Sequence, residues 1–502
     1  MKRHWYYRGS LKSCNYSCSY CPFSKRKGSV KALQEDKEAL FRFVEKIEQE
    51  NAICGAVQIV PYGEALIHSY YWEALARLSQ KESLDAIGAQ SNFSFPVEKM
   101  LDVFCENGGR KEKLRLWGTF HPEMVTVEKF VEQCKQLFEA QIKFSVGVVG
   151  VPENLGLIQE FRSLLPDSIY LWVNKMDGLK RKYTQEEIDT ILEVDEYFEL
   201  ELRHHKSDVW LCGKNRFVEA NGTMRRCNIC PQQVGNFYTD VTEKKLIQQE
   251  DFGKTQLCTR KECSCFLSYC NQNPEELLFF QPYPAFRIPS YPKAIFLDID
   301  GTLIPEGEKR IPENYVRGLF RLAKHSKLYF ATSLPYEIAR QRTREIWRIM
   351  DGGVFANGGR CVLRKNKERE KNWDEIEAMD RSWIEKAKEK SYEYGYTLHT
   401  YCKGKEIYKV TLVFSSKSET EIKKEKNQKI LVEELGIPET CQFLLEENCF
   451  QITKKGTGKL EGVLKICEKM GYKKQDVMVA GDSENDIPML QYFPNGIMVK
   501  GS

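Results

Sequence analysis

Three cysteines near the start of the chain are spaced for metal chemistry. Cys14, Cys18 and Cys21 are separated by three and two residues, and the aromatic Tyr20 stands directly before the last thiol. Thiolates at this spacing can hold three corners of a cubane [4Fe-4S] cluster, and the fourth iron then has no ligand from the motif. A structural zinc site or three buried thiols are the alternatives. Zinc would need a fourth Cys or His close by, and none follows Cys21 before Cys54.

This cysteine run resembles the cluster loop of the radical S-adenosylmethionine (radical SAM) superfamily. The resemblance implies that the open iron binds the amino and carboxylate groups of S-adenosylmethionine (SAM). It also implies that the reduced cluster cleaves SAM to a 5′-deoxyadenosyl radical, which is oxidoreductase chemistry. An electron donor such as flavodoxin or ferredoxin would then be a partner.

The elements that must position these cysteines follow from the hydrophobic pattern. From residue 4 to about 205, short apolar runs alternate with longer amphipathic stretches, which predicts an α/β fold with a parallel sheet and a site at the carboxyl ends of its strands. The resemblance implies a partial, TIM-like (β/α)6 barrel over residues 1–205. The expected strands are 5–8, 52–60, 86–90, 114–118, 144–149 and 170–173, and the expected helices include 31–50, 70–80 and 127–141.

Short motifs follow several of these strands. The run 61–64 is similar to the superfamily's Gly-Gly-Glu motif, with Tyr62 in place of the first glycine, and the run 147–153 is similar to its adenine-binding strand end. An ammonium group needs a carboxylate, and glycine lets the backbone come close. His121 follows the fourth strand and could either touch substrate or serve as a structural hydrogen-bonding group. The cofactor-binding residues that the resemblance implies are Tyr20, Gly63, Glu64, Ser91, Asn92, Gly147 and Gly150.

A second group of cysteines lies between residues 212 and 270. Cys212 and Cys227 flank an Asn221-Gly222 hairpin signal in a Cys-x9-Gly-x4-Cys unit, which resembles the start of the SPASM/Twitch auxiliary-cluster domains. We therefore expect a small cysteine-rich domain at 206–285 with one auxiliary [4Fe-4S] cluster, and a zinc ribbon is the alternative. The expected ligands are Cys212 and Cys227 with two of Cys258, Cys263 and Cys265.

A second chemistry begins after a proline-rich linker. An apolar run at 294–297 is followed by Asp298, Asp300 and the pair Gly301-Thr302. This resembles motif I of the haloacid dehalogenase (HAD) superfamily. The resemblance implies that Asp298 attacks phosphorus to form an aspartyl-phosphate and that Asp300 serves as general acid and base. The second Asp favours dephosphorylation over dehalogenation.

The remaining HAD motifs occur in the order that the superfamily uses. Thr332 ends a strand and would bond phosphoryl oxygens, and Lys459 would neutralise the phosphoryl group. The resemblance implies a HAD domain at 292–502, with a Rossmann-like core and a C2-type α+β cap at about 358–450, as in the Cof-like branch. The expected Mg²⁺ ligands are Asp298, Asp300, Asp482 and Asp486.

Composition limits the partners and the compartment. The chain has 502 residues, 42% hydrophobic and 29% charged, with a net charge of +4, so neither a nucleic-acid nor a membrane partner is expected. Eighteen cysteines without a secretory signal favour a reducing, cytoplasmic location.

Two functions remain open at this stage. The first is a multifunctional biosynthetic enzyme that modifies a small phosphorylated metabolite, such as a sugar or nucleotide, by radical chemistry and removes its phosphate. The second is a radical SAM enzyme that modifies peptides or proteins, with the HAD domain acting on a separate ligand or serving as a phosphate-ligand sensor. The intact pair Asp298 and Asp300 argues against the sensor.

Overall fold

The structure is a computed structural model that forms two compact units, Met1–Ser290 and Tyr291–Ser502. It describes residues 2–19, 21, 27–202, 215–225, 227, 233–241, 277–280, 282–364, 371–415, 422–446 and 448–499. Five of the residues discussed above lie outside the described residues, namely Tyr20, Cys212, Cys258, Cys263 and Cys265. Each unit is considered by itself.

The first unit is built on a nine-stranded sheet in the order β6-β5-β4-β3-β2-β1-β7-β8-β9. The first six strands are parallel and lie in sequential order, so all six expected strands are present. Their ends bring the polar loops of the sequence to one edge of the sheet. The strands are β1 Arg3–Gly9, β2 Gly55–Ile59, β3 Leu84–Ser91, β4 Leu114–Thr119, β5 Lys143–Gly150 and β6 Leu171–Lys175.

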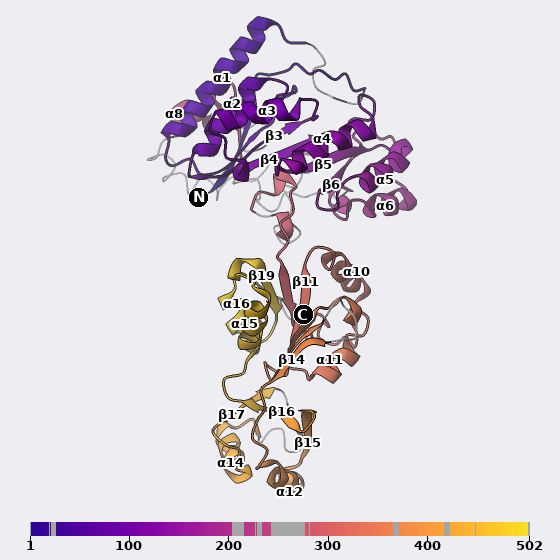
Figure 1. Ribbon diagram of the computed structural model, residues 1–502, viewed down its shortest axis with the longest axis vertical. Helices are drawn as coiled ribbons and strands as arrows, with labels where there is room; N and C mark the ends of the chain where they lie inside the picture. Colours follow the sequence, from indigo (N-terminus) through magenta and orange to yellow (C-terminus); the bar gives the residue numbers. More distant parts are fainter. Residues whose placement is uncertain are drawn as a thin grey trace. The chain divides into compact units, whose positions relative to one another are not determined.

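Helices connect successive strands of this sheet. Because every crossover steps in the same direction and parallel crossovers are right-handed, the connecting helices lie on one face of the sheet (Figure 1). Their apolar faces bury a continuous core that includes Phe43, Trp72, Phe104 and Phe130. The helices are α1 Val30–Gln49, α2 Ser69–Gln80, α3 Val97–Glu106, α4 Val127–Glu139, α5 Leu155–Leu164, α6 Gln185–Leu192 and α7 Phe198–Leu202.

The segment 282–290 closes the first unit by packing against strand residues of the same sheet. Phe286 lies in a cluster with Ala56 and Ala86, near the starts of β2 and β3. The Ser145 hydroxyl of β5 donates a 2.8 Å hydrogen bond to the Phe286 carbonyl oxygen. A segment that follows the cysteine-rich region in sequence is therefore part of the same core as the six parallel strands.

Arg287 is the polar anchor of this segment. Its guanidinium lies 4.0 Å from the ring centroid of Trp172 and 4.9 Å from that of Trp117, and the residue is 0% exposed. Nη1 donates to Asn174 Oδ1 at 2.9 Å and Nη2 to Glu201 at 3.3 Å. A buried cation of this kind is tolerated because a carboxylate and two aromatic faces offset its lost hydration.

Three short strands extend the sheet beyond β1. β7 (Asn215–Glu219) pairs in parallel with β1, and β8 (Thr223–Arg225) and β9 (Gln233–Asn236) continue antiparallel, followed by α8 (Phe237–Asp240). The hairpin expected at Asn221-Gly222 joins β7 to β8, and Gly222 has a φ of +87°, which favours glycine.

The second unit contains a seven-stranded sheet in the order β14-β13-β12-β11-β10-β19-β20. The central strand β10 pairs in parallel with β11 on one side and β19 on the other. The order in which the chain adds strands therefore reverses at β10, and such a switch point leaves a crevice at the carboxyl ends of the strands. The strands are β10 Ala294–Leu297, β11 Lys327–Ala331, β12 Gly352–Phe355, β13 Arg360–Arg364, β14 Lys371–Ile376, β19 Val477–Gly481 and β20 Asn495–Met498.

Four helices accompany this sheet. α15 packs against the sheet with Val463 and Ile466, which share a buried cluster with Phe296 and Val479 of the central strands. The core of the second unit is thus an α/β layer structure of the Rossmann-like type. The helices are α10 Glu313–Leu322, α11 Tyr336–Arg342, α15 Lys459–Met470 and α16 Ile487–Tyr492.

A separate four-stranded antiparallel sheet, in the order β15-β16-β18-β17, forms the cap of the second unit. Its core contains Trp383, Val410, Leu431 and Phe450, which come from both helical and strand segments, as expected of an α+β cap. The cap begins later than the expected residue 358, because β13 pairs with β12 and β14 pairs with β13 in the core sheet. The cap elements are α12 Ile384–Tyr394, β15 Tyr396–Lys403, β16 Glu406–Phe414, α14 Glu425–Leu435, β17 Cys441–Glu446 and β18 Cys449–Lys454.

None of the helices in the described part of the chain has both the length and the apolar character needed to cross a bilayer.

Candidate active sites

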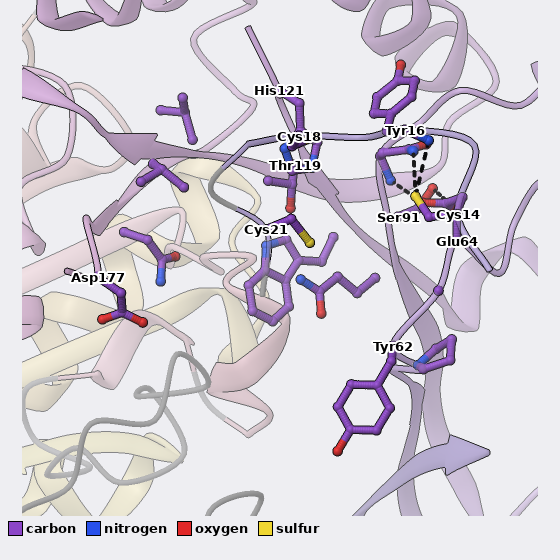
Figure 2. A pocket seen from close by; sticks show the side chains of 18 of the residues that line it. Cys14, Tyr16, Cys18, Cys21, Tyr62, Glu64, Ser91, Thr119, His121 and Asp177 are labelled. Carbon is purple, nitrogen blue, oxygen red and sulfur yellow. Dashed lines mark hydrogen bonds between the residues drawn. The ribbon is translucent and has the colours of Figure 1, made fainter. Parts of the chain in front are cut away.

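The first unit has a cavity of about 310 Å³ at the carboxyl ends of its parallel strands. The three motif cysteines all line it, together with Glu64, Ser91, Asn92 and His121, so the structure brings together residues that follow four different strands. Figure 2 shows Cys14 beside Ser91 and Glu64, and Cys21 beside Thr119.

The cysteine loop is held in place by backbone packing. The Glu64 amide donates to the Ser13 carbonyl at 2.9 Å, and the Gly63 amide donates to the Leu11 carbonyl at 3.1 Å. A Cβ at Gly63 would lie 2.1 Å from the Ser13 carbonyl oxygen, so only glycine permits this approach. The loop after β2 is therefore shaped to support the loop that carries the thiols.

Hydrogen-bond donors surround the first thiol. The Tyr16 amide lies 3.4 Å from Cys14 Sγ, and the Asn92 side-chain amide lies 4.0 Å from it. Burial raises the pKa of Cys14, and it raises that of Cys18 to about 11. N–H donors stabilise a thiolate, and a bound metal removes the thiol proton, so both features suit metal ligands.

A single zinc ion would require the three thiol sulfur atoms to lie close together. Among the described residues, the only set of three or more metal-binding side chains with ligand atoms within 4.8 Å of one another is Asp298, Asp482 and Asp486. The sulfur atoms of Cys14, Cys18 and Cys21 are thus spread more widely than the ligands of a single ion. A cube of four irons holds its thiolates farther apart than one zinc ion does, so this spacing is compatible with the expected cluster loop.

Glu64 is the buried carboxylate of this cavity. It accepts hydrogen bonds from the Ser91 hydroxyl at 2.7 Å and from the Asn92 and Leu66 amides at 2.6 and 3.1 Å. Burial raises its pKa to about 7, although these three donors oppose the shift. A carboxylate that is this desolvated gains most from a cationic ligand, such as an ammonium group.

The raised pKa of Glu64 gives a test of its surroundings. A carboxyl group that keeps its proton to higher pH in the folded state makes the free energy of unfolding fall as pH rises, here between about 4.5 and about 7. We expect cluster-free Glu64→Gln protein to lose about 3 kcal/mol of this pH dependence. Urea unfolding at pH 5 and pH 8 measures it. If the free energy of unfolding changed equally between these two pH values in wild type and variant, the prediction would be contradicted.

Of the other site residues expected in the first unit, some line the cavity and others do not. His121 lines the cavity, and burial lowers its pKa to about 4, so it is neutral near pH 7. Gly147 and Gly150 are not among the lining residues, whereas Val148 and Val149 are. A Cβ at Gly147 would lie 2.0 Å from the Trp172 ring, so this glycine makes room for an indole.

Sequence reasoning missed several lining residues on the strands themselves. Trp117, Trp172 and Asn174 all line the cavity, and Arg287 contacts each of them. Alternation along β4 could have indicated Trp117 and Thr119 as neighbours on one face. Nothing local indicated Arg287, because its contacts are made with residues far away in the sequence.

The second unit gathers its motif residues at the switch point of its sheet. Asp298 follows β10, Thr332 follows β11 and Asp482 follows β19, while Lys459 begins α15. Lys459 Nζ lies 2.9 Å from Asp298 Oδ2 and 2.7 Å from Asp486 Oδ1. The four motifs that the sequence separates by nearly the whole domain thus meet at one edge.

Charge at this edge is tightly balanced. Burial raises the pKa of Asp298, Asp486 raises it further, and Lys459 opposes both. Burial lowers the pKa of Lys459, but the carboxylates of Asp298 and Asp486 outweigh it and the net shift is upward. An ammonium between two carboxylates can therefore keep Asp298 oriented and available as a nucleophile.

The residues present fit a magnesium ion. Asp482 Oδ1 accepts a 2.7 Å hydrogen bond from the Thr302 hydroxyl, and a Cβ at Gly301 would lie 1.9 Å from Asp482 Oδ2. Asp486 already accepts from Lys459 and from the Asp482 and Ser483 amides, so it orients the loop. The ligand oxygens of Asp298, Asp482 and Asp486 lie within 4.8 Å of one another, and because Mg²⁺ uses few carboxylates and several waters, Asp298 and Asp482 could hold it while Asp486 orients the loop.

Asp300 differs from the expectation that it is a metal ligand. It does not belong to the aspartate set whose oxygens lie within 4.8 Å of one another, and its carboxylate pairs with Arg342 at 2.5 Å. Burial raises its pKa, which Arg342 opposes. A carboxyl group that can hold a proton suits general acid and base chemistry. No local signal in α11 indicated Arg342.

Loop residues near Thr332 also lie at the carboxyl ends of the strands of this sheet. The Thr332 hydroxyl accepts a 3.1 Å hydrogen bond from the Leu334 amide and keeps its own proton for another acceptor. The Asn357 amide donates to the Thr332 carbonyl at 3.2 Å. Asn357 Oδ1 is buried and has no hydrogen-bond partner within the described residues, so an unused acceptor remains on this loop.

Comparison with known proteins supports a hydrolase domain in the second unit. Residues 368–502 match the family described as haloacid dehalogenase-like hydrolase. This part of the chain includes Lys459, Asp482 and Asp486, while Asp298 and Thr332 precede it. The second unit therefore contains a HAD-like hydrolase domain. No curated protein matches the chain at a significant level.

Several solved structures align with about two fifths of the chain. A subclass IIB sugar phosphatase of the HAD superfamily is 21% identical, with 40% of this chain and 84% of that chain covered and a TM-score of 0.31. A HAD phosphatase from Bacteroides thetaiotaomicron is 18% identical, with 41% and 84% covered and a TM-score of 0.33. A protein from Thermotoga maritima is 18% identical, with 40% and 84% covered and a TM-score of 0.33.

Proposed function

We propose that this protein is a bifunctional enzyme that joins radical SAM chemistry to Mg²⁺-dependent hydrolysis of a phosphomonoester. The observation that carries the hydrolytic half is the contact of Lys459 with Asp298 and Asp486 at the switch point of the second unit. The observation that supports the radical half is one cavity lined by all three motif cysteines and by Glu64. The substrate we propose is a small phosphorylated metabolite, such as a sugar or nucleotide.

The hydrolytic steps follow from the residues of the second unit. Asp298 attacks phosphorus, the leaving oxygen takes a proton from Asp300, and the phosphoryl group is held on Asp298 as an aspartyl-phosphate. Asp300 then removes a proton from water, which attacks phosphorus and frees Asp298. Lys459 and the Thr332 hydroxyl offset the charge of the phosphoryl oxygens in both steps. Bound by Asp298 and Asp482, Mg²⁺ would supply further positive charge to the same oxygens.

The residues of the first unit have binding and orienting roles. Cys14, Cys18 and Cys21 would hold a [4Fe-4S] cluster, and Glu64 would bind the ammonium of SAM beside it. Together the cluster and SAM would supply a radical that abstracts hydrogen from substrate. Cys227 would contribute to an auxiliary [4Fe-4S] cluster with the cysteines outside the described residues. Trp117, Trp172 and the Arg287-oriented Asn174 would form the wall that positions substrate.

Metal removal tests the hydrolytic half. We expect the full-length protein to release phosphate from an aryl phosphate only with Mg²⁺, and EDTA to abolish the activity. Asp482→Ala should raise the Mg²⁺ concentration for half-maximal rate by about tenfold or more, because it removes one of two carboxylate ligands. An exposed acidic residue, Asp380, offers the control Asp380→Ala. Mg²⁺-independent hydrolysis, or no hydrolysis of any phosphomonoester in a broad panel, would refute the assignment.

A further inference from the structure

Lys409 is a cap residue that reaches the phosphoryl site. It lies on β16, and its Nζ donates to the Ser333 carbonyl oxygen at 2.5 Å and to Gln451 Oε1 at 2.5 Å. Ser333 directly follows Thr332 in the core, so this ammonium bridges the cap and the loop beside the reacting group. Lys459 is close enough to lower the pKa of Lys409, which places the two cations around the same region.

The charge of Lys409 lacks a direct counter-ion in the described structure. The residue is 3% exposed, and both of its hydrogen-bond acceptors are neutral oxygens. Of the basic side chains that contact the described motif residues, Lys459 and Arg342 pair with carboxylates, whereas Lys409 does not. A buried ammonium with neutral partners has lost hydration that an anion would restore.

The Glu446 carboxylate is linked to Lys409 only through the Gln451 side chain. Gln451 Nε2 donates to Glu446, and the other oxygen of Glu446 accepts a 2.7 Å hydrogen bond from Asn485 of the metal loop. The cap thus presents a continuous polar chain from Ser333 to Asn485 across the crevice. Glu446 is engaged at both oxygens, so it is not placed to neutralise Lys409 by contact.

We propose that Lys409 selects phosphomonoesters whose leaving group carries a second negative charge, such as a carboxylate. This inference rests on the proposed phosphatase function. The phosphoryl group is held by Lys459, Thr332 and the metal ligands in the core, and the leaving group then lies on the cap side. An anion there pairs with the Lys409 ammonium, and a neutral alcohol leaves the ammonium with its two neutral partners.

The ionisation state of Lys409 is consistent with selection of an anionic leaving group. Burial lowers its pKa to about 8, Lys459 lowers it further, and Cys449 and Glu446 oppose the shift. The ammonium is therefore present below about pH 8 and lost above it. Selection for an anionic leaving group should weaken as pH rises through this range.

A matched pair of substrates tests the inference. 3-Phosphoglycerate and glycerol 3-phosphate have the same phosphorylated carbon, but the former ends in a carboxylate and the latter in a hydroxymethyl group. We expect the wild-type chain with Mg²⁺ to prefer 3-phosphoglycerate by about tenfold or more in kcat/KM at pH 7. Lys409→Gln should remove the preference while changing kcat/KM for glycerol 3-phosphate by less than about threefold, and Lys409→Arg should retain it.

Other outcomes separate the inference from the function on which it rests. If the wild type hydrolyses an aryl phosphate but neither probe, the two probes are compared as competitive inhibitors, and 3-phosphoglycerate should bind more tightly. Equal kcat/KM or equal inhibition by the two probes in the wild type overturns the role of Lys409 and leaves the phosphatase intact. Failure to hydrolyse any phosphomonoester overturns both. Thermal unfolding shows whether the Lys409→Gln protein is folded. If it is not, the comparison of the two substrates in the wild-type protein still tests the inference.

Discussion

Replacement of Asp298 by Asn is expected to lower kcat for phosphomonoester hydrolysis by about a thousandfold or more. The amide has nearly the same shape but cannot attack phosphorus. Asp298 is 5% exposed and bonded to Lys459, so the variant should keep the local packing. Released phosphate measured under saturating substrate gives the rate, and the exposed Asp380→Asn serves as the control.

The same variant separates the two activities. Asp298→Asn should leave SAM cleavage unchanged, because the radical half uses residues of the first unit. Asp300→Asn should spare formation of the phosphoryl-enzyme more than its hydrolysis, since only the second step needs Asp300 as a base. Loss of SAM cleavage in a folded Asp298→Asn protein with full iron would show that the two sites are not independent.

Replacement of Cys14, Cys18 and Cys21 by Ala is expected to abolish reductive SAM cleavage. Anaerobically reconstituted wild-type protein should contain about eight irons, as two cubane clusters, and the triple variant about four. The readouts are iron content and 5′-deoxyadenosine formed with a chemical reductant. Two exposed cysteines, Cys105 and Cys402, offer matched controls that should change neither readout.

Metal analysis also tests the auxiliary cluster. Four irons together with one zinc in the wild-type protein would contradict a second cubane and indicate a zinc ribbon. Full iron with no SAM cleavage under any reductant would instead leave the auxiliary cluster standing and remove the radical chemistry.

Local patterns were sufficient for the elements and for the order of the motifs. The six parallel strands of the first unit and the central strand β10 are where hydrophobic periodicity predicts them. Strands and helices are defined by side chains a few residues apart, so their presence is readable along the chain. Cys14, Asp298 and Asp482 were identified for the same reason, because each belongs to a short motif at a strand end.

Contacts between distant residues were decided only by the tertiary structure. The pairing of Asp300 with Arg342, the position of Arg287 under Trp117 and Trp172, and the reach of Lys409 to Ser333 join side chains from separate elements. The assignment of β13 and β14 to the core sheet likewise depends on the pairing of β13 with β12 and of β14 with β13. Such contacts depend on how sheets and loops pack in three dimensions, and burial then makes each charge depend on the partner it meets. The sequence thus indicated which residues could carry chemistry, and the fold determined which groups surround them.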